Sequence, residues 1–384
     1  MSDNKSKKQD RRAFLGKLVL GSTALAATPV LGALFGNKND EKDDHITNNK
    51  EMSSIKRVRA LGFQWETQDP FLFCVHHEDK YPAGNKDMGP DASLLSGRNI
   101  GNDFHIKDGW RMYHGEKVPG FPGHPHRGFE TLTVVRKGMV DHADSAGGAG
   151  RYGDGDLQWM TAGKGLMHSE MFPLINTDKD NPLELFQIWL NLPRKSKMAQ
   201  PDYKMFWSEN IPNFNKNNVY IEVLAGTLFG KSSPKPPKDS WAYDPNNHVG
   251  VYNLHFNPGA EITLPKAGEG INRTLYVYEG SGIDVAGKAI PDYHAVDVEA
   301  AHDLSIKNGN NVVKVLILQG RPINEPVVQH GPFVMNSRQE IQQAFADYQR
   351  SRFGGWPWSR YDQVHDRSKG RFAKYVDGSE EIKA

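Results

Sequence analysis

Short apolar runs separated by turn-forming residues dominate the chain from Ile55 to about Pro193. The runs are rich in β-branched and aromatic residues, and Gly, Pro, Asn and Asp stand between them. They include PFLFCV, TLTVV, DLQWMT and ELFQIWLNLP. This pattern predicts the strands of a β-sandwich or β-barrel rather than an α/β sheet.

A second block of the same character follows, with candidate strands NVYIEVLAG, VGVYNLHFN, EITLP, TLYVYEGSGIDVAG and VVKVLILQG. Two β blocks of similar size predict an all-β chain with two barrels in tandem, over residues 55–210 and 211–335. The 38 glycines and 23 prolines agree with a turn-rich β protein and not with a helical bundle.

A single helical pattern, SRQEIQQAFADYQRSRFGG, comes after the second block. Asn336 or Ser337 can cap this helix, and Glu340 stands where a capping box requires it. Gly354 is expected to end the helix. Residues 336–384 are thus predicted to form a C-terminal helix and a polar tail, to which the sequence assigns no function.

The N-terminal residues 1–36 form a separate module. Arg11 and Arg12 precede Phe-Leu and a Lys, and an uncharged run follows, which resembles a twin-arginine export signal. Export by the twin-arginine machinery predicts a periplasmic protein, and an uncleaved signal would tether it to the membrane. As a membrane span, the uncharged run is interrupted by glycines and a proline. Residues 37–54 are charged and polar, which predicts a flexible tether.

Charge and cysteine content exclude several classes of function. The formal net charge is +1, so no general basic surface exists for nucleic acid. The one cysteine, Cys74, excludes an internal disulfide and any site built from several thiolates. It is expected to be a small buried apolar residue.

Candidate chemistry lies in two short motifs of the first block. In FPGHPHRGFETLTVV, His124 and His126 stand two residues apart beside a β-branched run, so a strand would direct both side chains to one face. His168 and Glu170 repeat this spacing in GKGLMHSEM. Each histidine alone could be an ordinary surface or core residue, but two same-face pairs in one block favour a shared metal site.

Three imidazoles and one carboxylate favour Fe, Mn, Ni, Cu or Zn over Ca or Mg. Four ligands leave positions of an octahedron open for substrate, dioxygen or water, which indicates catalysis rather than structural bracing. Glu170 is a candidate catalytic residue as well as a candidate ligand, because a carboxylate there can also act as a general base.

The motifs HPHRGFET, GDLQWMTAGKGLMHSEM and GPFVMNSRQEIQQAFADYQ, in this order, closely resemble the pirin family, from about Val58 to Gly354. The resemblance implies a bicupin, two jelly-roll barrels with a metal in the N-terminal one. It also implies that His124, His126, His168 and Glu170 bind iron, with Fe²⁺ expected. Some pirins resemble quercetin 2,3-dioxygenases and others are described as nuclear transcription cofactors, a role that an exported protein could hardly have.

The second barrel departs from this metal pattern. GINRTLYVYEG has Asn272 and Arg273 where an H-x-H pair would recur, and no later H-x-E follows. His255, His294 and His302 are scattered in this barrel and do not form same-face pairs with a carboxylate. The sequence therefore predicts a metal-free, structural second barrel.

Several neighbours of the motifs allow two interpretations each. The strand residues Gln158, Trp159 and Met160 either orient the ligands or simply pack in the core. Arg127 and Glu130 form either a charged shell around the site or an ordinary ion pair. The long segment 76–119 is expected to reshape the entrance to the site.

The leading hypothesis is an exported iron-dependent dioxygenase that acts on a flavonol-like or enol substrate with O₂. One alternative is a non-enzymatic iron protein of the cell envelope that senses redox state or docks a partner. Another is a cupin isomerase or hydrolase that uses Zn or Mn.

Overall fold

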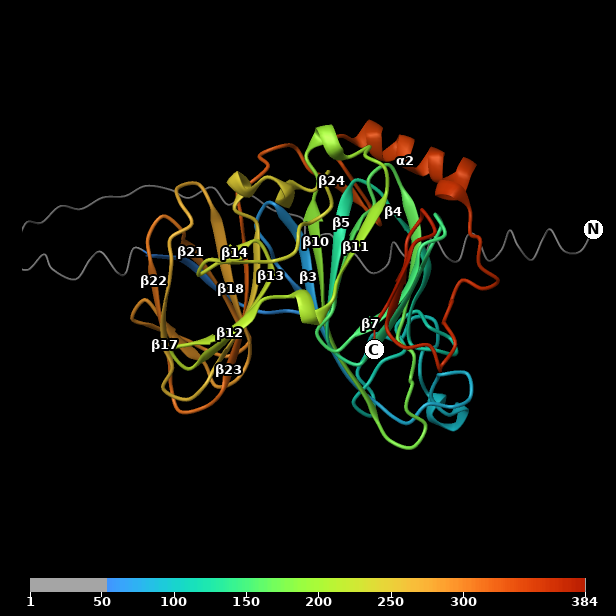
Figure 1. Cartoon of the computed structure of the whole chain (residues 1–384), viewed down its shortest axis with the longest axis horizontal. Helices are drawn as coiled ribbons and strands as arrows, with labels where there is room; N and C mark the ends of the chain where they lie inside the picture. The colour runs from blue at the N-terminus through green and yellow to red at the C-terminus, as the bar shows by residue number, and fades with distance from the viewer. Residues whose placement is uncertain (1–53, 384) are drawn as a thin grey trace, which may run out of the picture.

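Antiparallel strands are the main secondary structure of the computed structural model, which describes residues 54–383. The predicted signal, residues 1–36, and all of the predicted tether except Ser54 lie outside the described residues. Figure 1 shows two β domains side by side, with the helix α2 over the first. The all-β prediction is confirmed, and each domain is a jelly-roll-like sandwich of two sheets rather than a closed barrel. Between residues 54 and 383, no helix has the length and apolarity needed to cross a membrane.

The first domain consists of two six-stranded sheets. One, here called the interface sheet, has the order β11 (Asp202–Phe206), β8 (Leu157–Thr161), β5 (Phe129–Lys137), β10 (Asn181–Asn191), β3 (Phe71–Tyr81), β2 (Gln64–Trp65). The other, here called the ligand sheet, has the order β27 (Glu380–Ile382), β26 (Phe372–Lys374), β7 (Ala149–Gly153), β6 (Met139–Asp144), β9 (Leu166–Met171), β4 (Gly120–His126). Apolar side chains from both sheets meet in a common buried cluster.

The second domain pairs a seven-stranded sheet with a four-stranded one. The larger has the order β1 (Ile55–Ala60), β21 (His294–Glu299), β18 (Asn272–Glu279), β23 (Val313–Gly320), β16 (Gly250–Phe256), β13 (Val219–Ala225), β12 (Asn213–Lys216). The smaller has the order β17 (Glu261–Leu264), β22 (Leu304–Asn308), β19 (Ile283–Val285), β20 (Lys288–Ile290). The space between them is filled mainly by buried aliphatic side chains.

Short elements complete the two domains. The hairpins are β14 (Thr227–Leu228) with β15 (Lys231–Ser232), and β24 (Val328–His330) with β25 (Phe333–Met335). The 3-10 helices are η2 (Ala92–Leu95), η3 (Arg194–Ser196), η4 (Ser208–Asn210), η5 (Trp241–Tyr243), η6 (Pro245–Asn247) and η7 (Arg352–Gly354).

The two domains share an apolar interface between the interface sheet of the first and the seven-stranded sheet of the second. Trp65 stacks on Tyr276 of the second domain at 5.1 Å between ring centroids. Both belong to one buried cluster that draws residues from each domain, and Cys74 lies fully buried in it, as predicted. Because this surface is largely apolar, burying it stabilises the relative position of the domains.

Each end of the described chain crosses to the opposite domain. β1, assigned by sequence to the first barrel, instead pairs with β21 in the second. The tail strand β26 pairs with β7 and extends the ligand sheet, as the red strands beside β7 in Figure 1 show. The predicted ranges 55–210 and 336–384 therefore each contain a segment that pairs across a predicted boundary. Strand alternation shows that a segment can pair but does not show which sheet edge it joins.

The helix α2 (Arg338–Ser351) begins as predicted. The Ser337 hydroxyl accepts a hydrogen bond from the backbone N–H of Glu340, and Glu340 reaches back to the N–H of Asn336 at 3.0 Å. The helix ends earlier than predicted, because Arg352, two residues before Gly354, already adopts the left-handed conformation, at φ 50°.

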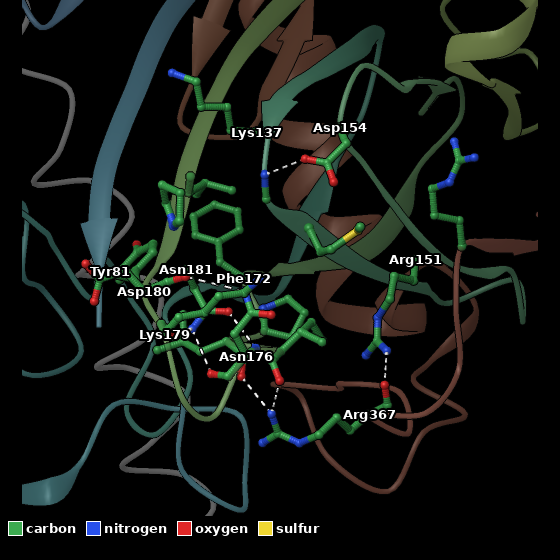
Figure 2. Close-up of a pocket in the computed structure, with 18 of the residues that line it drawn as sticks. Tyr81, Lys137, Arg151, Asp154, Phe172, Asn176, Lys179, Asp180, Asn181 and Arg367 are labelled. Atoms are coloured by element: carbon green, nitrogen blue, oxygen red, sulfur yellow. Dashed lines mark hydrogen bonds between the residues drawn. The ribbon is translucent and has the colours of Figure 1, made fainter. Parts of the chain in front are cut away.

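Two arginines hold the tail on the first domain. The buried Arg151 pairs with Asp141, at 2.6 Å between Nε and Oδ1, and its other N–H groups donate to backbone carbonyls of residues 365–369. Arg367 donates to the carbonyls of Leu174, Ile175 and Asn85. Figure 2 shows both arginines at the wall of a cavity of about 680 Å³ between the tail and residues 172–183.

Replacing Glu130 by Gln is expected to change how stability depends on pH. This buried carboxyl accepts hydrogen bonds from Thr161 and from Ser240 of the second domain, both at 2.6 Å. Burial nevertheless raises its pKa from an ordinary 4.5 to about 7. Since the folded pKa is the higher one, the unfolded chain ionises first, and the free energy of unfolding falls between about pH 4.5 and pH 7.

The difference between the two pKa values corresponds to a change of about 3 kcal/mol in the free energy of unfolding. Urea unfolding of the wild type and Glu130→Gln at pH 5 and pH 7.5 measures this difference. The free energy of unfolding of Glu130→Gln should increase relative to that of the wild type as the pH rises. Equal pH dependence of the two proteins would contradict the assignment.

Candidate metal centre

Strand register brings the two predicted pairs together on the inner face of the ligand sheet. β4 and β9 are antiparallel, and His124 lies directly opposite His168. Directly opposed residues point to the same face, and so do residues two apart along one strand. His126 and Glu170 therefore join that face. The register of β4 shifts between Phe121 and His124, which sets where the histidines stand.

The three histidines form a compact cluster. Each offers a ring nitrogen, and these atoms all lie within 4.8 Å of one another. The ring centroid of His124 lies 4.8 Å from that of His126 and 4.4 Å from that of His168. His168 is fully buried and His126 is 4% exposed. The pairing of two neighbouring strands, β4 and β9, thus places three imidazoles close together.

Glu170 lies at the edge of this cluster. Its Oε2 is 3.8 Å from His168 Nε2. The interface sheet holds the carboxylate: the Thr133 hydroxyl donates to Oε1 at 2.7 Å, and Gln187 Nε2 donates to Oε2 at 3.2 Å. Burial raises the pKa of Glu170, while the hydrogen bond from Thr133 opposes that rise. The proposed set of four ligands stays a prediction, but all four side chains face the same space.

The imidazoles are in the form that binds metals. Burial lowers the pKa of His124 to about 4 and lowers the pKa values of His126 and His168 well below their ordinary range, so all three are neutral at pH 7. The Nδ1–H of His124 donates to the Pro122 carbonyl at 3.0 Å, which leaves its Nε2 as a lone-pair donor.

A metal ion fits this donor set. Among the described residues, buried His126 Nδ1 and both ring nitrogens of His168 have no hydrogen-bond partner. Buried polar atoms are normally paired, and unpaired ones mark an ion, a water or a reactive group. Nitrogen ligands with one oxygen suit Fe, Mn, Ni, Cu or Zn.

A third same-face pair was missed by the sequence analysis. His142 and Asp144 on β6 lie opposite Glu170 and His168, respectively. Both side chains are buried, and His142 Nε2 lies 3.1 Å from Asp144 Oδ2. The signal was present in the sequence, because MVDHADS repeats the spacing of the other two pairs on a strand between turns.

Arg127 and Glu130 do not form a charged shell around the ligands or an ion pair with each other. Arg127 pairs with Asp347 of α2 at 2.8 Å, and its backbone bonds to Pro332 and Val334 in the β25 segment. The chain that follows the ligand pair is thereby tied to the C-terminal helix.

Gly128 makes this close approach possible. It has φ 86°, and a Cβ there would lie 2.0 Å from the Val334 carbonyl oxygen. Buried Lys197 donates to the Gly128 and Val334 carbonyls at 2.8 and 3.0 Å. The loop after His126 is therefore held both by the β25 segment and by Lys197.

The side chains of β8, the strand before the second ligand pair, alternate between the two faces of the interface sheet. Trp159 lies in the apolar cluster between the domains, as the packing interpretation predicted. Gln158 lies opposite Thr133 and within 3.4 Å of the Tyr152 hydroxyl, on the face that holds Glu170. Met160 packs inside the first domain.

The long segment 76–119 packs beside the centre through Phe121 of β4. Tyr113 packs on Phe121 at 5.1 Å between ring centroids, and Phe121 lies 6.4 Å from His124. His114 also contacts Phe121, at 5.9 Å. Aromatic side chains from this segment therefore pack around Phe121, beside the most exposed of the three histidines, and the expected effect on the entrance stays a prediction.

In the second domain, the positions that would repeat the ligand pair have structural partners. Asn272 donates to the Asp69 carbonyl at 2.7 Å, and Arg273 Nε donates to Gln319 at 2.8 Å. The interior is aliphatic. The absence of metal from this domain stays a prediction.

Comparisons with known proteins agree with this architecture. Residues 54–190 match the family model described as Pirin, and residues 251–354 match the Pirin C-terminal cupin domain. A pirin-like protein of Solanum lycopersicum is 39% identical over 238 residues, which cover 61% of this chain and 77% of that protein. A Pseudomonas aeruginosa protein named as a candidate quercetin 2,3-dioxygenase is 37% identical over 60% of this chain and 79% of its own length.

The solved structure of a quercetin 2,3-dioxygenase from Acinetobacter baumannii superposes with a TM-score of 0.63, covering 79% of this chain and 98% of that one. Its sequence identity is 24%, so it supports the bicupin fold and not the activity.

Gly123→Ala is expected to disturb the ligand strand from outside. The N–H of Gly123, next to His124, donates to the carbonyl of tail residue Tyr361 at 2.8 Å. A Cβ at position 123 would lie 2.6 Å from Tyr361 Cδ1. Such overpacking should lower the free energy of unfolding by about 1–3 kcal/mol.

Adding Tyr361→Ala should restore much of that loss, because it removes the clashing ring. Gly309→Ala, where no atom lies within 4 Å of the new Cβ, is the matched control. Thermal unfolding and metal content of all variants are the measurements. An equal loss of unfolding free energy in Gly123→Ala and in the double variant with Tyr361→Ala would show that the tail does not contact β4 as described.

Proposed function

Because the chain belongs to the pirin family, we propose that it is an iron-dependent dioxygenase, exported by the cell, that acts on an enol or phenol substrate of the flavonol type. The observation that carries the proposal is the buried cluster of His124, His126 and His168 with Glu170 at its edge. The names of the Pseudomonas relative and of the Acinetobacter structure agree with this substrate class.

The three imidazoles would hold the metal, and Glu170 would either complete the ligand set or accept a proton. A bound iron would supply an open coordination position for substrate and O₂ and the redox capacity for their reaction. Thr133 and Gln187 direct the Glu170 carboxylate toward the site. A raised pKa suits a group that takes up the proton of a substrate hydroxyl at Glu170 Oε1 or Oε2.

Aromatic residues of the interface sheet would bind and shield the substrate. Trp189 lies 5.4 Å from His126 and 4.3 Å from Phe129 between ring centroids, and Phe73 lies 4.9 Å from Trp189. Trp189 and Phe73 are partly exposed, whereas Phe129 is buried. Flat apolar rings beside the imidazoles fit an aromatic substrate and keep water from the reacting atoms.

The export part of the proposal rests on the sequence of residues 1–36. The Arg11-Arg12 pair and the uncharged run support recognition by the twin-arginine machinery and a periplasmic location. That route carries folded proteins, which suits a chain whose buried metal must be inserted before export.

Protein purified from its native cells should contain about one iron per chain, and His126→Ala should lose it. His126 is one of the three clustered imidazoles, and removing it leaves two. Elemental analysis measures iron, zinc and manganese together. His255→Ala, in the second domain, is the matched control and should retain the metal. Zinc or manganese instead of iron would contradict the dioxygenase assignment and favour the isomerase or hydrolase alternative.

Glu170→Gln should keep most of the iron and lose oxygen consumption with a flavonol. The three imidazoles form the compact group without Glu170, whereas Gln cannot accept the substrate proton. Oxygen uptake and iron content are measured together, with Glu130→Gln as a buried control. Loss of iron would show that Glu170 is an essential ligand. Wild-type protein that holds iron but never consumes oxygen with flavonols would favour the sensor or docking alternative.

A further inference from the structure

We infer that His142 and Asp144 form a positioning pair that orients His168 in the metal centre. The inference rests on the proposed metal centre and adds to it a third strand, β6, that the predicted ligand set does not include. His142 would act through His168 and not by contact with substrate.

Strand pairing places the pair beside the ligands. Asp144 lies directly opposite His168, and His142 directly opposite Glu170, so both side chains point to the ligand face. The ring centroids of His142 and His168 are 5.6 Å apart. His142 is fully buried and Asp144 is 1% exposed.

Hydrogen bonds to Asp144 determine which nitrogen of His142 carries the proton. Asp144 Oδ1 accepts the backbone N–H groups of Ala146 and Gly148 at 2.8 and 2.9 Å. Its Oδ2 lies 3.1 Å from His142 Nε2. A carboxylate only accepts, so Nε2 carries the hydrogen and Nδ1 presents a lone pair. That Nδ1 is buried and has no partner among the described residues.

His168 needs a hydrogen-bond acceptor for its Nδ1–H, which is what the lone pair of His142 Nδ1 offers. Its Nε2 faces Glu170 Oε2, which makes Nε2 the metal-binding atom and places the hydrogen on Nδ1. Ligating histidines nearly always donate their second N–H to a fixed acceptor, which sets the tautomer and the ring orientation. His168 Nδ1 makes no direct hydrogen bond to any residue of the described range 54–383. His142 Nδ1, on the adjacent strand, is the acceptor that matches it, directly or through one water.

The tail fixes β6 from the outer side. The Trp358 indole N–H donates to the Asp144 carbonyl at 2.8 Å, and His365 Nε2 donates to the His142 carbonyl at 2.9 Å. The backbone of the pair is therefore anchored, and a change in its side chains should alter the hydrogen bonding without freeing the strand.

Asp144→Asn separates a positioning role from a structural one. The Asn carbonyl oxygen can still accept from Ala146 and Gly148, so the turn is kept. The amide N–H would then donate to His142 Nε2 and force the hydrogen onto Nδ1. Two N–H groups would face each other at His142 and His168, and metal binding should weaken although the fold is intact.

The experiment measures the affinity for cobalt(II) by competition with a chelator, together with the visible absorption of bound cobalt. Asp144→Asn and His142→Ala should each bind about 10–100-fold more weakly than the wild type, with a shifted absorption band. His255→Ala is the control and should match the wild type. Thermal unfolding of the metal-free proteins tests that each variant is folded.

Wild-type affinity and an unchanged band in both variants would overturn the inference while leaving the metal centre in place. A weakened His142→Ala with a normal Asp144→Asn would also overturn it, because only packing would then be involved. If the wild type itself binds no cobalt and contains no iron, both the proposed function and this inference fail.

Discussion

The pairing of β4 with β9 in one register is the constraint on which the metal centre depends. It places His124 opposite His168, and the period of two along each strand then brings His126 and Glu170 to the same face. A slip of one residue would turn every ligand of one strand away from the other pair. Much of the surrounding structure holds this register. Tyr361 bonds to β4 just before His124, and the β25 segment bonds to Arg127 just after His126.

The local part of this arrangement could be predicted from sequence, and the long-range part could not. Same-face spacing is set within three residues, so the pairs at 124–126 and 168–170 were recognisable, as were the cap at Ser337 and the β character of both domains. Arg127 pairs with Asp347, and Glu130 accepts a hydrogen bond from Ser240. Each of these partners is more than a hundred residues away, and no local pattern encodes such contacts. The same reason explains why β1 joined the second domain against the predicted boundary.

The two domains share a fold but differ in what they bury. The second is filled with aliphatic side chains, whereas the first buries histidines, carboxylates, threonines and glutamines on facing sheets. Most of the buried side-chain atoms without a partner in residues 54–383 belong to the first domain. Unpaired polar atoms reduce stability. The apolar interface with the second domain therefore offsets a cost that the chemistry of the first imposes.

The crossing of the tail has a consequence for the order in which the protein is made. β26 and β27 complete the ligand sheet, although every other strand that the structure describes is synthesised before them. The contacts of Gly123, His142 and Asp144 likewise need residues 358–365 of the tail. The first domain is thus completed only after the strands of the second domain have been synthesised. A stop codon or proteolytic cut between residues 355 and 383 would therefore affect a candidate centre whose histidines lie far earlier in the chain.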